Sequence, residues 1–117
     1  MSELTVCAPE VLEKVLMKTK QGLETVFGEK LKSVILYGSY ARGDQNEESD
    51  VDVMALVEIP KEDIPKFRDD VIDFCTDINL EYDVLVSINI QDDYTFYKYE
   101  NSMPYFQNVI REGIRVE

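Results

Sequence analysis

Two aspartates at the start of an apolar run are the strongest chemical feature of the sequence. Asp50 and Asp52 alternate with valines in a segment that stays apolar up to Val57. In a strand, residues two apart point the same way, about 7 Å from one another. Burying two like charges costs several kcal/mol, so a core strand that begins in this way favours a bound divalent cation such as Mg²⁺. The alternative is that both carboxylates lie at a solvated strand end.

A glycine and a serine follow the apolar segment 31–37, where the chain must turn. Gly38 would let backbone N–H groups approach an anion closely, and Ser39 adds a hydroxyl donor. A helix that begins here would add partial positive charge. Arg42, about one turn further on, would point toward the same place. These residues could bind a phosphate, although a Gly-Ser pair is also an ordinary turn.

Asp83 precedes a further apolar run in the same manner. If that run forms a strand beside the one starting at Asp50, three carboxylates converge at one edge of the sheet. Hard oxygen ligands in such a cluster favour Mg²⁺ or Mn²⁺. A metal site opposite a phosphate-binding turn would suit phosphoryl or nucleotidyl transfer.

Helices and strands alternate along the chain, which predicts an α/β layered domain with a small sheet. A length of 117 residues fits a single domain spanning 1–117. The predicted elements are a helix over 9–27, strands over 31–37 and 50–58, a helical stripe from 64 to 78, a strand centred on 83–88, and a last helix capped by Ser102 and ended by Gly113.

Composition excludes several chemistries. The chain has no histidine and two cysteines, so histidine-based catalysis and four-cysteine metal sites are impossible. No apolar run approaches about 18 residues and no secretion signal is visible, which favours the cytoplasm over a membrane. The net charge is −12, and residues 38–83 hold 14 of the 24 acidic side chains. This acidity argues against direct nucleic-acid binding and suits metal cations or a basic partner.

The Gly38-Ser39 pair, ten intervening residues and the Asp50–Val53 segment together resemble the nucleotidyltransferase motif of the DNA polymerase beta superfamily. The flanking residues 36–43 are similar to the minimal nucleotidyltransferase branch. That branch includes antitoxins encoded beside HEPN-domain ribonuclease toxins. The resemblance covers nearly the whole chain and implies an α/β (α+β) fold with a small mixed sheet flanked by helices.

The resemblance also implies roles for single residues. Gly38 and Ser39 would bind the triphosphate of ATP, and Arg42 would assist. Asp50 and Asp52 would hold two Mg²⁺ ions. Asp83 matches the family's third acid by strand position alone; that acid binds one metal and helps to deprotonate the acceptor hydroxyl.

The implied activity is transfer of AMP from ATP to a protein hydroxyl. The resemblance points to a tyrosine of a partner HEPN toxin as acceptor, within a hetero-oligomer in which this chain is the antitoxin. Two alternatives stay open: a small-molecule nucleotidyltransferase of the aminoglycoside type, and a non-catalytic antitoxin that acts by binding alone. Half of the twelve aromatic residues fall in 94–106, where they form either core or a platform for a nucleobase or a partner protein.

Overall fold

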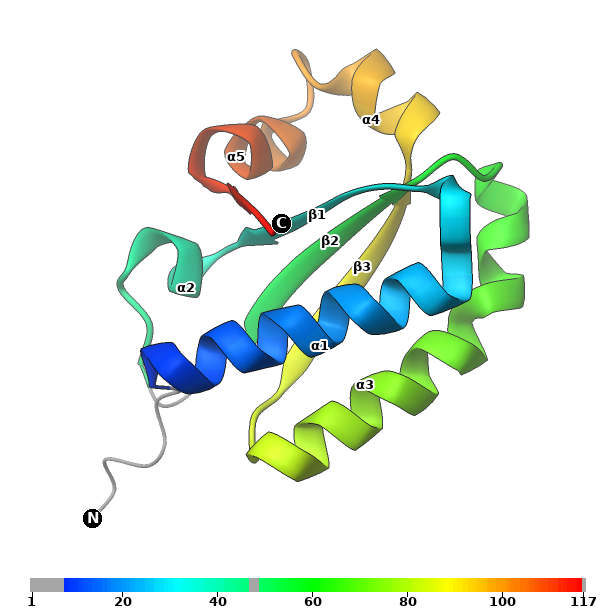
Figure 1. Ribbon diagram of the computed structural model, residues 1–117. Coiled ribbons are helices and arrows are strands. Elements are labelled where there is room, and N and C mark those ends of the chain that lie inside the picture. The colour runs from blue at the N-terminus through cyan, green and yellow to red at the C-terminus, as the bar shows by residue number, and fades with distance from the viewer. Residues whose placement is uncertain (1–7, 47–48, 117) are drawn as a thin grey trace.

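A four-stranded sheet lies between two layers of helices in the computed structural model, which describes residues 8–46 and 49–116 (Figure 1). The elements are α1 (Pro9–Phe27), η2 (Gly28–Lys30), β1 (Leu31–Tyr37), α2 (Ser39–Arg42), β2 (Val51–Val57), η3 (Lys61–Phe67), α3 (Arg68–Tyr82), β3 (Val86–Asp92), α4 (Asp93–Tyr99), α5 (Pro104–Glu112) and β4 (Ile114–Arg115). The strand order is β3-β2-β1-β4. β2 runs antiparallel to β1 and parallel to β3, so the predicted mixed sheet flanked by helices is confirmed.

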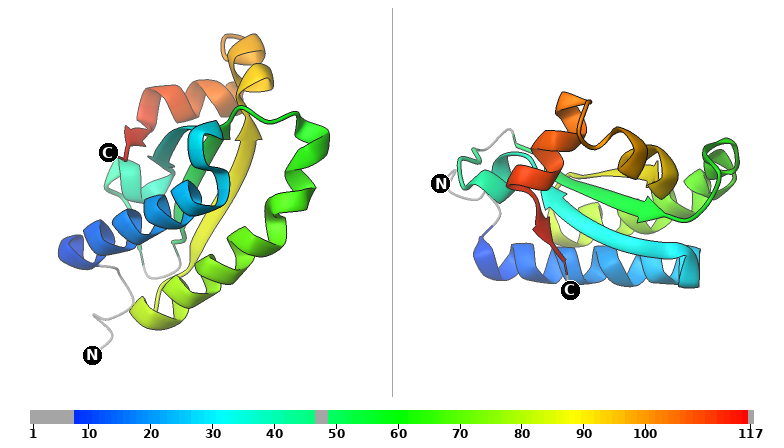
Figure 2. Two further views of the ribbon diagram at one scale, coloured as in Figure 1. Left: turned by 45° about the vertical axis from the view of Figure 1, so that its right-hand side comes forward. Right: turned by 90° about the horizontal axis from the view of Figure 1, so that it is seen from above.

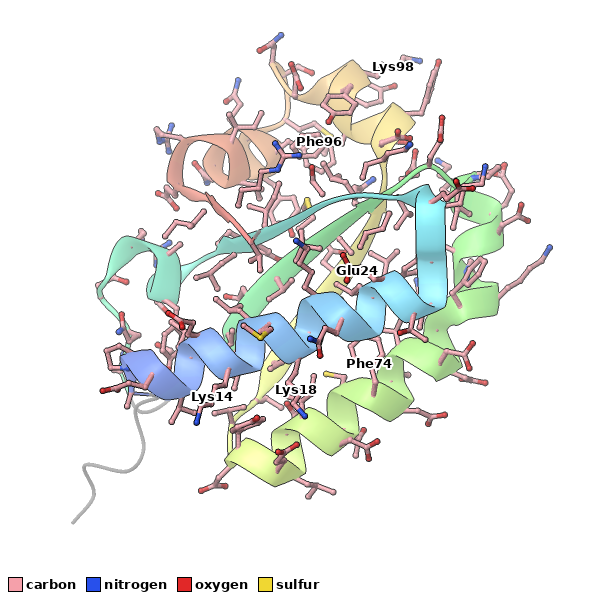
Figure 3. The ribbon with its side chains drawn as sticks, in the orientation of Figure 1. Lys14, Lys18, Glu24, Phe74, Phe96 and Lys98 are labelled. Atoms are coloured by element: carbon pink, nitrogen blue, oxygen red, sulfur yellow. The ribbon has the colours of Figure 1, made fainter. Side chains whose placement is uncertain are left out.

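The long helices α1 and α3 cover one face of the sheet (Figures 1 and 2). α1 begins with a proline in its first turn, buries Val15 and Leu23 completely, and ends at Gly28, whose φ of 56° suits glycine. Gly22 lies in the middle of α1 because the Phe74 ring of α3 occupies the space where a Cβ would be (Figure 3). The close contact between the two helices therefore explains a glycine that weakens the helix by itself.

The shorter helices α4 and α5 lie on the other face and cover only part of it (Figure 2). Met54 and Leu56 of β2 pack there against Phe96, Phe106 and Val109 in a small second core. Alternate residues of β2 point to the larger core on the α1 side. Asp52 shares the face of Met54, just beyond the area that the small core fills.

The structure corrects three local predictions. β3 begins at Val86 rather than at Asp83, because α3 continues to Tyr82 and Asp83 forms its C-cap. The N-cap of α5 is Met103, followed by Pro104, and not Ser102. The aromatic segment after β3, where the sequence pattern predicts no element, forms the helix α4. No helix of the described ranges has the length and apolar character needed to cross a membrane.

Candidate active site

The turn after β1 brings the backbone directly against an acidic side chain. Gly38 has φ 79° and ψ −157°, a conformation that side chains disfavour. A Cβ atom at this position would also overlap the carboxylate of Asp52. Two independent constraints therefore require glycine here, and the short helix α2 starts at Ser39, immediately beside Asp52.

The register of the sheet fixes the position of Asp52. Tyr37, the last residue of β1, pairs with Asp52 across the antiparallel ladder, and Ser87 of β3 pairs with it on the other side. Val51 and Val53 point into the core of the α1 face. Asp52 thus stands on the α5 face of the sheet, between two neighbouring strands.

The two predicted metal ligands interact with each other. Partial burial raises the pKa of Asp52 above its ordinary value, the charge of Asp50 raises it further, and Arg42 opposes both effects. Ionisation of Asp52 is therefore disfavoured unless a positive charge comes close. Carboxylate oxygens are the ligand type that Mg²⁺ prefers, and a bound cation would relieve the repulsion between these two side chains.

Arg42 joins α2 to the C-terminal helix. Its Nε lies 3.2 Å from Oδ2 of Asp44, and its Nη1 lies 3.2 Å from Oε1 of Glu112 at the end of α5. The Arg42 side chain remains 43% exposed. The guanidinium is thus held next to the Gly38 turn and is still reachable by an anion.

One side of α5 forms a wall of the site. Tyr105, Asn108, Val109 and Glu112 recur at helical spacing and line a cavity of about 340 Å³. The same cavity is lined by the residues at the end of β1, on α2 and on β2: Tyr37, Gly38, Ser39, Arg42 and Asp52. Four of the six predicted site residues therefore share one cavity, and Asp50 interacts electrostatically with one of them.

Hydrogen bonds hold the first turn of α5 over the sheet. The hydroxyl groups of Tyr37 and Tyr105 lie 2.8 Å apart, and Nδ2 of Asn89 on β3 donates to the Tyr105 hydroxyl at 2.7 Å. Burial raises the pKa of Tyr37, and its hydrogen bond with Tyr105 and the charges of Tyr105 and Asp52 act in the same direction. The Tyr37 hydroxyl therefore stays protonated and serves as a neutral hydrogen-bonding group.

Asp83 stands apart from these residues. It is exposed at the C-cap of α3, with φ 54° and ψ 50° in the left-handed region. Over the described ranges, no three acidic, cysteine or histidine side chains gather closely enough to hold a metal, so the predicted convergence of Asp50, Asp52 and Asp83 is not formed. The nearby acids Asp77 and Glu81 do not replace Asp83, since they lie on α3 at the opposite face of the sheet.

The sequence alone indicates no specific role at the site for several residues of the cavity. Tyr37, Asn89, Tyr105, Asn108 and Glu112 belong to the cavity or to the hydrogen bonds that support it. Within the last helix, the polar residues at 105, 108 and 112 recur at helical spacing, which is the pattern that could have indicated a site-facing stripe. Asn89 carried no such pattern, because its place depends on the pairing of β3 with β2.

Comparison with known proteins identifies the class to which this fold and site belong. The nucleotidyltransferase domain family matches residues 16–114. A Methanocaldococcus jannaschii protein named "Putative protein adenylyltransferase MJ0604" is 34% identical over 101 residues, which are 86% of this chain and 93% of that protein. The chain therefore belongs to the nucleotidyltransferase domain family and is a nucleotidyltransferase.

Two solved structures share the fold at low sequence identity. A structure described as a "putative nucleotidyltransferase" from Sulfolobus solfataricus has a TM-score of 0.57 and 18% identity, covering 98% of this chain and 87% of its own. A chain of a toxin–antitoxin crystal structure with AMP-PNP has a TM-score of 0.56 and 20% identity, covering 87% of this chain and 72% of its own.

Proposed function

We propose that the protein transfers AMP from ATP to a hydroxyl group of another protein. The observation that carries this proposal is the contact between the Gly38 turn and the Asp52 carboxylate inside one cavity, with Ser39 and Arg42 beside them. A phosphate-binding turn next to paired carboxylates is the equipment for nucleotidyl transfer. The relative named as a protein adenylyltransferase and the neighbour crystallised with AMP-PNP support the same donor and acceptor classes.

In this mechanism the residues at the cavity have separate roles in binding ATP and in the transfer step. Gly38 and Ser39 bind the triphosphate tail through backbone and hydroxyl donors, while Asp50 and Asp52 would hold Mg²⁺, two ions being expected. Bound Mg²⁺ would supply positive charge that stabilises the attacking and leaving oxygens. The acceptor hydroxyl attacks the α-phosphorus and pyrophosphate leaves. The sequence predicts that Asp83 is the third acid, which binds one metal and helps to deprotonate the acceptor. The position of Asp83 at the end of α3 does not support this role.

Arg42 must exchange partners when the nucleotide enters. In the free protein its guanidinium contacts the carboxylates of Asp44 and Glu112. A triphosphate is a stronger bidentate partner for arginine than a partly exposed carboxylate. Binding of ATP therefore competes directly with the ion pair that ties α2 to α5.

The proposed acceptor is a tyrosine on a partner protein, and the resemblance noted above makes that partner a HEPN-type toxin. Three tyrosines of α4 remain largely exposed: Tyr94 at 70%, Tyr97 at 57% and Tyr99 at 40%. Exposed aromatic patches of this kind usually mark interaction sites. The chain would thus act as an antitoxin that docks a basic partner through α4 and modifies it at the Asp52 cavity.

Surface charge near α4 agrees with a basic partner. A cavity of about 670 Å³ lies between α4 and the segment that follows β2, and Glu58, Glu62 and Asp93 are among its lining residues. Lys98 lies over the rings of Tyr94 and Tyr99, 5.6 and 5.4 Å from their centres. Figure 3 shows this lysine on the outer side of α4, while Phe96 points inward. Cationic side chains of a partner would meet these carboxylates, while the lysines of the same lining, Lys61 and Lys98, offset part of the negative charge.

One incubation tests the proposal and separates it from its alternatives. The protein, ATP, Mg²⁺ and the candidate toxin are combined, and intact-mass spectrometry follows the toxin. A gain of one or more AMP groups that disappears with the Asp52→Asn variant supports protein modification. Neutralisation of the toxin by this variant, with no change in toxin mass, would instead indicate an antitoxin that acts by binding. Transfer to an aminoglycoside but not to the toxin would indicate a small-molecule enzyme.

A further inference from the structure

A phenol of the chain itself faces the residues expected to bind ATP. Tyr105 lines the same cavity as Gly38, Ser39 and Asp52. Its side chain is 40% exposed, so solutes that enter the cavity can reach it. A tyrosine hydroxyl is also the acceptor group of the function proposed above. The geometry points to Tyr105 as an acceptor of AMP within the same molecule, an inference that rests on the proposed AMP transfer.

The Tyr105 hydroxyl is held in a defined position. Asn89 donates to it from β3 at 2.7 Å, and the Tyr37 hydroxyl lies 2.8 Å away on β1. These two strands flank β2, which carries Asp52. The acceptor oxygen is thus fixed above the strands on either side of the carboxylate, and a nucleophile already in place loses little entropy on reaction.

Tyr37 is the other phenol of the cavity and is a poorer acceptor. It lies within β1, and it is less exposed than Tyr105. Tyr105 stands near the beginning of α5, where it follows Pro104 and the turn that starts at Tyr99. Tyr105 is therefore the more accessible of the two phenols.

The reaction is the same transfer with a different acceptor. Oη of Tyr105 attacks the α-phosphorus of ATP, and a phosphodiester bond forms between tyrosine and AMP. The bond between the α-phosphorus and the bridging oxygen breaks, and pyrophosphate leaves with that electron pair. The phenolic proton passes to solvent, which reaches the exposed side chain. Because the single phenolic oxygen is used up when the phosphodiester forms, each chain accepts one AMP on Tyr105.

Self-modification has a functional consequence. The AMP group on Tyr105 replaces its hydroxyl proton, disturbs the hydrogen bonds that the hydroxyl makes with Tyr37 and Asn89, and fills the space where a partner hydroxyl must enter. A chain without a partner therefore converts itself into a form with a blocked cavity. A bound partner protects Tyr105 by supplying the competing acceptor.

The test uses the full chain alone with ATP and Mg²⁺, followed by intact-mass and peptide-level mass spectrometry. We expect a gain of one AMP on the peptide that contains Tyr105, and loss of that gain in the Tyr105→Phe and Asp52→Asn variants. Tyr97→Phe is the matched control, since Tyr97 is more exposed than Tyr105 but lies on α4 outside the cavity. This variant should gain AMP to the same extent as the unchanged chain.

Each other outcome overturns the inference in a distinguishable way. An unmodified chain that still transfers AMP to its partner would remove Tyr105 as an acceptor and leave the proposed function standing. AMP attached to Tyr94, Tyr97 or Tyr99 would show that exposure, not the cavity, selects the acceptor. A chain that neither modifies itself nor transfers AMP to any protein would overturn the proposed function together with the inference.

Discussion

The two faces of the sheet differ in how much of their surface is covered by apolar packing. On the α1 and α3 face, the inward side chains of β1, β2 and β3 meet two long helices in one continuous apolar core. On the α4 and α5 face, a smaller apolar core stops short at both ends. One end exposes the polar cavity around Asp52, and the other exposes the tyrosines of α4.

This difference shows how so short a chain can carry both a stable fold and a site. The larger core stabilises the sheet from one side, because apolar burial contributes roughly 25 cal/mol per Å². The α4 and α5 face can therefore keep charged and polar groups near the sheet. The free energy that this takes from the stability of the fold is offset by the apolar core on the α1 and α3 face. It follows that equivalent substitutions on the two faces should differ in kind: those on the α4 and α5 face alter function, and matched changes on the outer side of α3 do not.

The largest expected effect is at Asp52. Asp52→Asn should lower AMP transfer by roughly three orders of magnitude, the factor that about 4 kcal/mol of lost transition-state stabilisation produces. Initial rates with ATP, Mg²⁺ and an acceptor protein measure it. Asp77→Asn, an equal change on exposed α3, is the control and should keep the full rate. Near-normal transfer by the Asp52 variant would contradict the metal site.

The same variant should not destabilise the fold. Because the pKa of Asp52 is raised in the folded state, ionised Asp52 opposes folding, and this cost appears as the pH rises from the unfolded pKa through the folded one. Asp52→Asn should therefore melt at a slightly higher temperature than the unchanged chain at neutral pH. The two melting temperatures should become equal at acidic pH. A lower melting temperature at neutral pH would mean that the carboxylate makes a stabilising contact.

The second effect concerns the α4 end of the same face. Tyr94→Ser combined with Tyr97→Ser should weaken the partner complex by about thirtyfold, equivalent to about 2 kcal/mol for lost aromatic anchors. Isothermal titration with the partner measures it, and circular dichroism confirms an intact fold. The control is Leu80→Ser on α3, at a residue that is 79% exposed on the other face. If both proteins bind the partner equally, it docks elsewhere.

Much of this architecture could be predicted because local pattern and tertiary contacts agree. α1, β1 and β2 occur within about one residue of the predicted ranges, since their apolar spacing matches one buried face. The Gly38–Asp52 part of the site was also predictable, because Gly38 directly follows β1, Asp52 lies near the start of β2, and these two strands pair directly with each other.

The remainder depended on contacts that the sequence does not display. The segment 83–88 looks like a strand by composition, but Asn79 bonds the N–H of Val86 at 2.9 Å and thereby places the start of β3 three residues after Asp83. The α5 wall likewise depends on hydrogen bonds and ion pairs between residues up to 70 positions apart, such as Arg42 and Glu112. The spacing of apolar residues in the sequence does not indicate which distant polar residues form hydrogen bonds or ion pairs with each other.

Ser39→Ala should have an intermediate effect. It removes one of several hydrogen-bond donors to the triphosphate, and a hydrogen bond to a charged group contributes about 1.5 kcal/mol, so the KM for ATP should rise about tenfold. The measurement is the dependence of the transfer rate on ATP concentration. Ser39→Thr keeps the hydroxyl and should restore most of the affinity. An unchanged KM in the alanine variant would place the phosphates away from this turn.

A smaller effect on AMP transfer is expected at Asp83, which lies at the C-cap of α3 and does not line the cavity around Asp52. Asp83→Asn should reduce transfer by less than about threefold, since an exposed charge away from the cavity contributes little. Asparagine tolerates the left-handed conformation at φ 54°, so the fold should survive and any loss can be assigned to the charge. A loss as large as that of Asp52→Asn would restore Asp83 as the third metal ligand.

The smallest effect should run in the opposite direction. Glu112→Gln removes the carboxylate that pairs with Arg42 at 3.2 Å, leaving the guanidinium freer to bind phosphate. A partly exposed ion pair contributes about 0.2–1 kcal/mol, so ATP should bind about threefold more tightly at low salt. The gain should shrink as added salt screens the pair in the unchanged protein. Titration with a non-hydrolysable ATP analogue measures the affinity and its dependence on salt.

The control is Glu81→Gln, which breaks the ion pair with Lys18 on the opposite face and should leave ATP affinity unchanged. Weaker ATP binding by Glu112→Gln would show that this ion pair orients Arg42 for the nucleotide rather than competing with it. The ion pair would then be a stabilising part of the α5 face and not a contact that ATP must displace.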